Sequence, residues 1–413
     1  MTCRPVAVAL AVCAAIVTPS PSVVAAAPPA VSAPSAIVVE TTSGEAVFER
    51  LAASRRPIAS ATKLMTALLA LERSKLSDVV PAARYRALAV ESKINLQPGE
   101  KLTMADLLRA LLLASANDAA VTIAEHVSGS RNAFVRDMNA RARDLGLKDT
   151  RFANPVGLDA PTNRSTARDL VTLTLELRKS SFFKRTVDRA GATLNSGSRP
   201  RAIANRNRLI RREPFVDGVK TGHTIGAGYV LVGSGTRNGV SLVSVVLGTA
   251  SEAAREADTL ALLRYGFKQF RRARPVRRGN ILTRVPIRFR EGAELDLIAG
   301  RSVTRVVRKG RRLRTDVAGV PAEIVGPVER GQRFGVVKVT DRASGELVAE
   351  VPLVAAAAVP AATVADRGRD YFTRPTTIAL LMAVVLASVA LALLRRRVQS
   401  ASRRQQAQES WVA

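Results

Sequence analysis

The stretch of sequence that decides the fold is Ala59-Ser60-Ala61-Thr62-Lys63, because an apolar run typical of a buried helix follows it directly. Residues three apart lie on the same face of a helix, so Ser60 and Lys63 are expected within hydrogen-bond reach. A neutral lysine can take the proton of a serine hydroxyl and make the serine a nucleophile. A desolvated site or a second nearby cation would keep the lysine neutral. The same residues also fit a plain helix start with a capping serine and a surface lysine.

A second polar motif, Ser115-Ala116-Asn117, lies where a helix predicted over residues 102–113 stops, with Thr103 as its cap. Residues two apart point the same way in an extended turn, so Ser115 and Asn117 are expected to reach one cleft. A serine there could pass a proton to a leaving amine, and an asparagine could hold a substrate amide. Taken alone, the motif equally fits a polar turn that ends a helix.

A third motif, Lys220-Thr221-Gly222, lies in a strand predicted over residues 215–223. A lysine and a threonine together can bind a carboxylate, the first by its charge and the second by its hydroxyl. A glycine lets a substrate approach the backbone closely. The plain alternative is a strand end with a solvated lysine.

The three motifs occur in the order S-x-x-K, S-x-N and K-T-G, a set typical of serine β-lactamases and penicillin-binding proteins. With its flanking residues, the chain resembles the serine D-alanyl-D-alanine carboxypeptidases (low-molecular-mass penicillin-binding proteins, peptidase family S11) over residues 36–270. It departs from them at Asn163-Arg164, where the family often has His-Tyr. The stretches that carry the resemblance are residues 59–66, 115–120, 154–158, 165–167 and 217–224.

The resemblance implies a role for each motif residue. Ser60 would be the acylated nucleophile, Lys63 its general base, and Ser115 the proton relay. The backbone N–H groups of Ser60 and His223 would form an oxyanion hole, in which each donor can be worth about 3 kcal/mol. The residues implied to bind substrate are Asn117, Lys220, Thr221, Gly222 and His223, with Arg206 and Arg255 as two further arginines near the site.

The implied reaction removes the terminal D-alanine from a peptidoglycan stem peptide without a cofactor. Ser60 attacks the penultimate carbonyl, D-alanine leaves, and water hydrolyses the acyl-enzyme. Penicillins and other β-lactam antibiotics are expected to acylate the same serine. DD-endopeptidase or transpeptidase activity on crosslinks stays open, because the acyl-enzyme can also yield to an amine and a crosslink can be the donor. A catalytically inactive envelope-binding protein is an alternative of a different class, against which the intact motifs weigh.

A serine β-lactamase is the nearest enzymatic rival. Class A members use an additional glutamate for deacylation. The glutamates between the second and third motifs are Glu125, Glu176 and Glu213, and none stands in the expected Glu-x-x-Leu-Asn context. The sequence therefore predicts no fast hydrolysis of β-lactams.

The chain has 413 residues and a net charge of +29, carried mostly by arginine. Such a balance usually indicates nucleic acid or an anionic surface as the partner. Arginine is abundant throughout, however, and the targeting segments argue against nucleic acid. Both cysteines, Cys3 and Cys13, lie in the expected signal, so the mature chain would have no disulfide. With His126 and His223 as the two histidines a zinc site is not expected, and His126 is expected to be structural.

Apolar segments near the two ends predict export and anchoring. Residues 1–27 fit a signal peptide, with Arg4 before an apolar run and small residues near its end. Residues 376–394 carry no charge and would reach about 28 Å as a helix, close to the hydrocarbon thickness of a bilayer. Arginines follow in the tail, residues 395–413, and basic residues favour the cytoplasmic side. We therefore expect a single-pass protein of the cell membrane with an extracytoplasmic catalytic domain.

The order of the elements predicts an α/β catalytic domain over residues 36–272. Strands are expected at both of its ends, with helices between them and a closing helix over residues 252–270. The sheet is thus built from distant parts of the chain and joined by a helical cluster, and the resemblance implies the penicillin-binding/β-lactamase-like transpeptidase fold. The strands of this domain are expected over residues 36–39, 46–49, 215–223, 229–234 and 240–247.

A small all-β domain is expected over residues 275–353, because short apolar stretches separated by glycine and arginine turns recur there. Residues 28–35 are expected to be a linker before the catalytic domain, and residues 354–375 a linker before the membrane helix. The strands of the β domain are expected over residues 281–289, 295–298, 317–325, 334–340 and 347–351.

Overall fold

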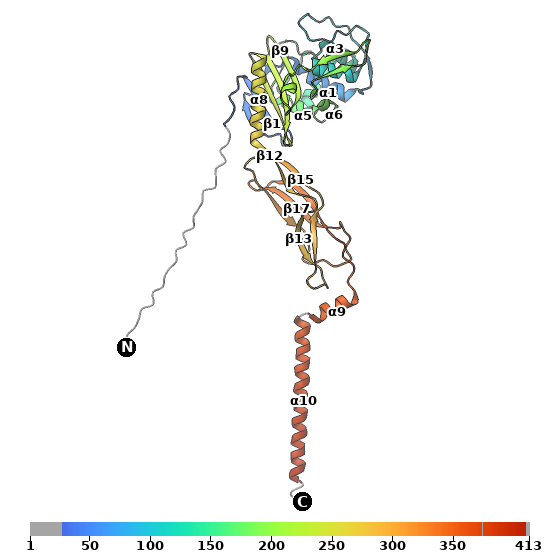
Figure 1. The fold of residues 1–413 in the computed structure, drawn as a ribbon, viewed down its shortest axis with the longest axis vertical. Coiled ribbons are helices and arrows are strands. Elements are labelled where there is room, and N and C mark those ends of the chain that lie inside the picture. The colour runs from blue at the N-terminus through green and yellow to red at the C-terminus, as the bar shows by residue number, and fades with distance from the viewer. Residues whose placement is uncertain (1–26, 374, 410–413) are drawn as a thin grey trace, which may run out of the picture. The chain divides into compact units, whose positions relative to one another are not determined.

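The computed structural model describes residues 27–373 and 375–409, with side chains up to residue 401. The predicted signal peptide, except for its last residue, lies outside the described residues. The chain forms two compact units (Figure 1). The first comprises residues up to Arg272 together with Val306–Gly310, and the second comprises Ala273–Arg305 and the residues from Arg311 onward.

The first unit contains an antiparallel five-stranded sheet in the order β2-β1-β11-β10-β9. The first strand, β1, pairs on one side with β2 and on the other with β11, about two hundred residues later, as in the register Ile37↔Val245. Strand β9, which carries the Lys220 motif, lies at one edge of the sheet. The strands are β1 (Ser35–Glu40), β2 (Ala46–Arg50), β9 (Val216–Thr224), β10 (Gly228–Arg237) and β11 (Val240–Thr249).

The two faces of the sheet are covered by different helices, as the alternation of side chains along β11 requires. Leu242 and Val246 pack in one apolar cluster with α8 (Glu252–Gln269). Val243 and Val245 belong to the larger cluster on the other face, which contains the helical part of the unit. Figure 1 shows α8 on one side of the sheet and α1, α3, α5 and α6 on the other.

The helical part is built around α1 (Lys63–Arg73), whose first eight residues are all buried. A helix buried all round has to be apolar on every face, which explains the continuous apolar run after the Ser60 motif. A short 3₁₀ helix over Ala59–Thr62 leads directly into α1. The helices around it are α2 (Met104–Arg109), α3 (Asn117–Ser128), α4 (Arg131–Asp144), α5 (Ala167–Leu177) and α6 (Ser181–Val187), with the one-turn α7 (Leu209–Arg212) outside them.

The helix predicted over residues 102–113 differs in detail. Residues Lys101–Thr103 form strand β5, α2 follows, and a π-helical turn over Ala110–Ala114 ends the run. The predicted cap is confirmed, because the Thr103 side chain accepts a hydrogen bond from the N–H of Asp106. Short strand pairs complete the unit: β3 (Arg56–Pro57) with β6 (Arg164–Ser165), β4 (Val79–Pro81) with β5, and β7 (Gly191–Leu194) with β8 (Arg201–Ala204).

The second unit is built on a five-stranded sheet in the order β13-β14-β18-β17-β16. Leu297, Val337 and Val351 are fully buried in its apolar core. The strand predicted over residues 317–325 is wrong beyond Ala318, because Gly319 and Pro321 break it, and the arginine-rich strand β15 was not predicted. The strands of this sheet are β13 (Ile281–Pro286), β14 (Glu294–Ala299), β16 (Leu313–Ala318), β17 (Arg333–Asp341) and β18 (Leu347–Ala355). The strands β12 (Phe270–Val276) and β15 (Val303–Arg308) pair with each other in a separate two-stranded sheet.

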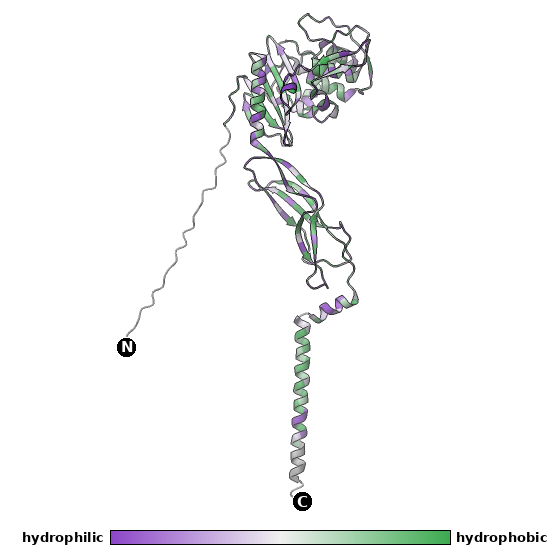
Figure 2. Ribbon diagram, in the orientation of Figure 1, coloured by the Kyte–Doolittle hydropathy of each residue, from purple (hydrophilic) through white to green (hydrophobic). Residues whose placement is uncertain are grey.

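The chain continues into helices α9 (Val364–Thr373) and α10 (Pro375–Glu409). Helix α9 lies inside the segment expected to be a linker. The part Pro375–Ala401 of α10 is long and apolar enough to cross a membrane, and almost none of it is buried. Figure 2 shows the apolar residues running along most of α10.

Candidate active site

The Ser60 motif lies on the 3₁₀ turn that precedes α1, rather than on the α-helix itself. Side chains three apart eclipse each other in a 3₁₀ helix, so Ser60 and Lys63 face one another. Lys63 Nζ donates hydrogen bonds to Ser60 Oγ at 3.1 Å and to the carbonyl of Val156 at 2.5 Å. Ser60 lines a surface cleft, whereas Lys63 is completely buried beneath it.

Burial lowers the pKa of Lys63 from 10.5 to about 7. The negative charge of Glu91 opposes this shift, Arg206 adds to it, and Asp118 opposes it more weakly. Desolvation and a second cation are thus both present at this lysine. A sizeable fraction of Lys63 is therefore neutral near pH 7, the state in which it can accept the Ser60 proton.

Two glycines allow the backbone to close tightly around the Ser60 turn. A Cβ atom on Gly157, where φ is +88°, would lie 2.0 Å from the carbonyl oxygen of Ala59. A Cβ atom on Gly222 of β9 would lie 3.0 Å from the backbone nitrogen of Ser60. The third motif therefore runs directly against the first, in a contact that a side chain would block.

The second motif lies between the π-helical turn and α3. Ser115 adopts a left-handed conformation (φ 61°, ψ 30°), and Ala116 is extended, so the turn is not the simple extended one expected. Ser115 lines the cleft. Asn117 is 5% exposed, and its Nδ2 donates a hydrogen bond to Glu91 Oε2 at 2.6 Å. The local geometry, with a π-turn next to a left-handed residue, is of the kind found at functional sites.

The third motif joins the second through Lys220. Its buried Nζ donates to Ser115 Oγ at 2.9 Å and to the carbonyl of Thr221 at 2.9 Å. Burial lowers the pKa of Lys220 well below the ordinary lysine value, and the charges of Lys63, Arg206 and Arg255 lower it further. The centre of the site thus consists of two serines, each hydrogen-bonded to a buried lysine.

The remaining sequence-predicted residues lie around this centre. Thr221, Gly222 and His223 line the cleft along β9. The His223 ring stacks on Tyr229, with ring centroids 4.0 Å apart. Arg206 is exposed and donates from Nε to the carbonyl of Ala114 at 3.0 Å.

Arg255 is buried on α8 and fixes the backbone of the third motif. It donates from Nη1 to the carbonyl of Gly222 at 3.3 Å and from Nη2 to Glu252 at 2.6 Å. Its guanidinium lies over the Tyr229 ring, 5.4 Å from the centroid. Arg206 therefore holds the carbonyl that precedes the second motif and Arg255 a carbonyl within the third, and both also line the cleft.

The cleft itself has a volume of about 870 Å³ and a strongly positive lining. One acidic side chain, Glu252, lies among the described lining residues. Such a cleft favours an anionic ligand. The cationic lining residues are Lys93, Arg199, Arg201, Arg206, Arg208, Arg211 and Arg255.

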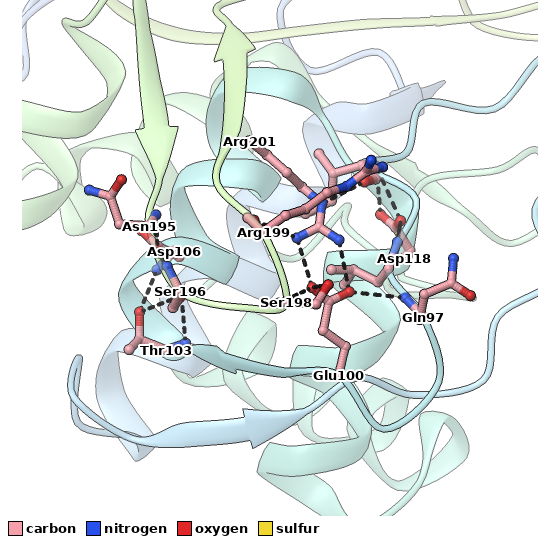
Figure 3. A network of polar contacts seen from close by, with 12 residues as sticks. Gln97, Glu100, Thr103, Asp106, Asp118, Asn195, Ser196, Ser198, Arg199 and Arg201 are labelled. Carbon is pink, nitrogen blue, oxygen red and sulfur yellow. Dashed lines mark hydrogen bonds and ion pairs between the residues drawn. The ribbon is translucent and has the colours of Figure 1, made fainter.

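A polar network secures the outer wall of this cleft (Figure 3). Glu100 and Arg201 form a buried ion pair, with Nη1 and Nη2 each 2.8 Å from a carboxylate oxygen. Asp106 accepts from the N–H groups of Asn195 and Ser196. Asp118, at the start of α3, accepts from the backbone N–H groups of Ile94 and Leu96. These carboxylates tie the β7–β8 hairpin and residues 94–100 to the helices that carry the second motif.

A match to a protein-family model shows to which family the chain belongs. Residues 22–251 match the model of the peptidase family S11, described as D-alanyl-D-alanine carboxypeptidase. The chain belongs to this family. The carboxypeptidase DacF of Bacillus subtilis is 32% identical over 335 residues, which cover 78% of this chain and 85% of that protein. DacC of Escherichia coli is 31% identical over 341 residues, covering 79% and 84%.

Solved structures of penicillin-binding proteins confirm the expected fold class. Penicillin-binding protein 5 from Haemophilus influenzae matches with a TM-score of 0.59 at 28% identity, covering 81% of this chain and 99% of that one. Penicillin-binding protein 6B from Escherichia coli matches with a TM-score of 0.60 at 28% identity, covering 80% and 98%. The family match and the motif-based resemblance therefore agree.

Sequence reasoning missed several residues of the site. Glu91 and the carbonyl of Val156 both contact motif side chains, yet neither belongs to a motif. The Asn163 side chain, in the stretch that departs from the family, donates to Thr62 Oγ1 at 3.2 Å and so braces the Ser60 turn. His126, expected to be structural, is instead exposed in the last turn of α3. A loop carboxylate and a backbone carbonyl leave no periodic signal in a sequence.

Proposed function

We propose that this chain is a membrane-anchored serine D-alanyl-D-alanine carboxypeptidase that removes the terminal D-alanine of a peptidoglycan stem peptide through an acyl-enzyme on Ser60. The observation that carries the proposal is the Lys63–Ser60 hydrogen bond, made by a fully buried lysine whose pKa burial lowers to about 7. A buried neutral amine next to a serine hydroxyl is an activated nucleophile.

In acylation, Lys63 takes the Ser60 proton while Oγ attacks the carbonyl carbon of the penultimate D-alanine. The tetrahedral oxyanion accepts hydrogen bonds from the backbone N–H groups of Ser60 and His223. The close approach of Gly222 to the Ser60 nitrogen supports this arrangement. The C–N bond then breaks, Ser115 passes a proton to the departing amine of D-alanine, and the proton that Lys63 took up replaces it on Ser115, so that Lys63 is neutral again. The hydrogen bond that Ser115 accepts from Lys220 supports this relay.

In deacylation, neutral Lys63 takes a proton from water as the water oxygen adds to the acyl carbon. Lys63 then returns a proton to Ser60 Oγ as the ester bond breaks and the shortened peptide is released. Thr221 and the positive cleft, including Arg206 and Arg255, receive the terminal carboxylate of the substrate. Asn117 holds the substrate amide. β-Lactams carry a carboxylate next to an acylating carbonyl and react with the same serine. The excess of cations along the cleft lining supports a substrate with a free carboxylate.

The proposed domain organisation is a signal peptide over residues 1–27, a catalytic domain over residues 36–272, a β domain over residues 275–353 and a spanning helix over residues 376–394. Linkers over residues 28–35 and 354–375 separate them. The basic tail, residues 395–413, lies on the cytoplasmic side, so the catalytic domain acts outside the cell membrane. The apolar run of α10 and the arginines that follow it support this orientation.

The test measures D-alanine release from a stem pentapeptide by the detergent-solubilised full chain, beside Ser60→Ala. Ser54→Ala, which changes a serine outside the cleft, is the matched control. We expect release by the wild type and by Ser54→Ala, and none by Ser60→Ala. A folded wild-type protein that releases no D-alanine from the pentapeptide but cleaves a crosslinked dimer would instead be a DD-endopeptidase. Activity on neither would favour an envelope-binding protein.

A further inference from the structure

A carboxylate outside the three motifs, that of Glu91, is built into the site next to the second motif. Its Oε2 accepts a hydrogen bond from Asn117 Nδ2 at 2.6 Å and another from the hydroxyl of Tyr85. Its Oε1 accepts from the backbone N–H of Leu88 at 3.0 Å. Burial raises the pKa of Glu91, but these hydrogen bonds outweigh burial and lower it below the ordinary value. Glu91 is therefore a fixed anion at the pH of the reaction.

The first consequence concerns the Asn117 side chain. The backbone N–H of Asn117 donates to the carbonyl of Ser92 at 2.7 Å, so both its backbone and its carboxamide are tied to residues 91–92. A carboxamide has two N–H donors and one acceptor. Glu91 binds one of the donors, which determines where the second N–H and the oxygen point. Without an acceptor at this place, rotation about χ2 would interchange them.

The second consequence concerns the charge of Lys63. Four ionisable groups interact electrostatically with Lys63. Glu91 and Asp118 are anions, Arg206 is a cation, and Lys220 is a second buried lysine. Glu91 has the largest effect of the four on Lys63, and it works against burial by favouring the charged form. Asp118 already accepts hydrogen bonds from three backbone N–H groups. Glu91 is thus the anion whose removal should change the pKa of Lys63 most clearly.

We propose that Glu91 is a positioning residue for acylation, which orients the Asn117 carboxamide and whose negative charge acts on Lys63. It touches neither the substrate nor the reacting atoms and acts through these two side chains. The inference rests on the roles proposed above for Lys63 and Asn117. Because Glu91 is 26 residues from Asn117 in the sequence, this link exists only in the folded chain.

The experiment measures the second-order rate constant for acylation by a fluorescent penicillin as a function of pH, using the detergent-solubilised full chain. The variants are Glu91→Gln, which removes the charge at nearly constant shape, and Tyr85→Phe, which removes one donor to Glu91 but keeps the charge. The rate is expressed per folded molecule, with folding followed by thermal unfolding. The rate constant is expected to rise with pH along an acidic limb and then to reach a plateau. Loss of structure alone would lower the plateau, whereas a change in the environment of Lys63 would shift the acidic limb along the pH axis.

The wild-type limb is expected near pH 7, so that about a tenth of the plateau rate remains one pH unit lower. In Glu91→Gln the limb moves to lower pH, since the charge that favours protonated Lys63 is gone, and about a quarter or more of that variant's plateau should remain at the same pH. Its plateau falls about tenfold because a neutral amide oxygen holds Asn117 more weakly than the carboxylate does. In Tyr85→Phe the limb stays in place. A Glu91→Gln limb that coincides with the wild type overturns the proposal.

If Glu91→Gln does not fold, the variant Glu91→Asp tests the proposal instead. It keeps the charge but shortens the side chain, so the limb should stay and the plateau should fall. A plateau equal to that of the wild type would overturn the proposed hold on Asn117. The two proposals fail differently: a wild-type chain that no penicillin acylates rejects the serine-enzyme mechanism, whereas normal acylation with an unmoved limb rejects only the role of Glu91.

Discussion

Lys220 donates a hydrogen bond to Ser115 across 2.9 Å, between a strand and a turn that lie 105 residues apart in the sequence. Both side chains are buried, at 1% and 2% exposure. Since Ser115 Oγ accepts from Lys220, the O–H of Ser115 is available to donate elsewhere. The geometry therefore suits a hydroxyl that gives its proton to a leaving amine while its oxygen stays hydrogen-bonded to the lysine behind it.

Replacing Ser115 by alanine removes this relay. We expect kcat/KM for D-alanine release to fall about 100-fold or more, because a positioned proton donor typically contributes that much. The Tm should change little, since the hydroxyl is small. Ser344→Ala, in an exposed turn of the second unit, is the control and should leave kcat/KM unchanged. A Ser115→Ala enzyme with wild-type kcat/KM would show that the amine takes its proton from another group.

The buried Lys63 also makes stability depend on pH. Burial lowers its pKa from 10.5 to about 7 in the folded chain, so the unfolded chain binds this proton more tightly. The free energy of unfolding should therefore rise as the pH increases from about 7 to about 10.5. Lys63→Met removes the titrating group, and urea unfolding over this pH range measures the difference. If wild type and Lys63→Met have parallel profiles, Lys63 is charged in the folded state.

Much of this site follows from the sequence, because the three motifs need only local rules to be found. The Ser60–Lys63 contact depends on three-residue spacing, and the capping role of Thr103 depends on its place before an apolar run. The apolar residues over 240–247 likewise predicted a strand, which is present as β11. In each case the neighbours in the sequence are the neighbours in space.

The rest of the fold and of the site depends on tertiary contacts, which rules about neighbouring residues do not predict. Glu91 reaches Asn117 from a loop, and the left-handed conformation of Ser115 follows from the π-turn before it. Strand β15 was missed because Arg305 lies between Val303 and Val307 on one face of the strand and so interrupts the apolar pattern of period two. Such features result from tertiary packing, so a single sequence gives no signal for them.

The buried Glu100–Arg201 pair predicts a second pH effect, at acidic pH. Burial raises the pKa of Glu100, but hydrogen bonds from Arg201 and from the N–H groups of Ser198 and Gln97 outweigh it and lower the pKa from 4.5 to about 2. The stabilisation is therefore complete above about pH 4.5 and is lost as the pH falls towards 2.

Glu100→Gln should lower the free energy of unfolding by about 3 kcal/mol near pH 7, because it leaves Arg201 buried without its partner. It should also raise KM, since Arg201 belongs to the cleft lining. Urea unfolding and steady-state kinetics measure the two effects. Glu346→Gln, at an exposed turn, is the matched control and should change neither. Equal stability of Glu100→Gln and Glu346→Gln would show that the pair contributes nothing.

The orientation of α10 can be tested with single cysteines, because both natural cysteines lie in the expected signal peptide and would be removed with it. Ser400→Cys places a thiol after the arginines at the end of the apolar run, and Ser344→Cys places one in an exposed turn of the second unit. A membrane-impermeant maleimide added to intact cells should label Cys at 344 and leave the one at 400 unmodified until the membrane is permeabilised. The physical reason is that arginines next to a spanning helix favour the cytoplasmic side. Labelling of both sites in intact cells would mean that α10 does not cross the membrane, and the anchor would have to be sought elsewhere in the chain.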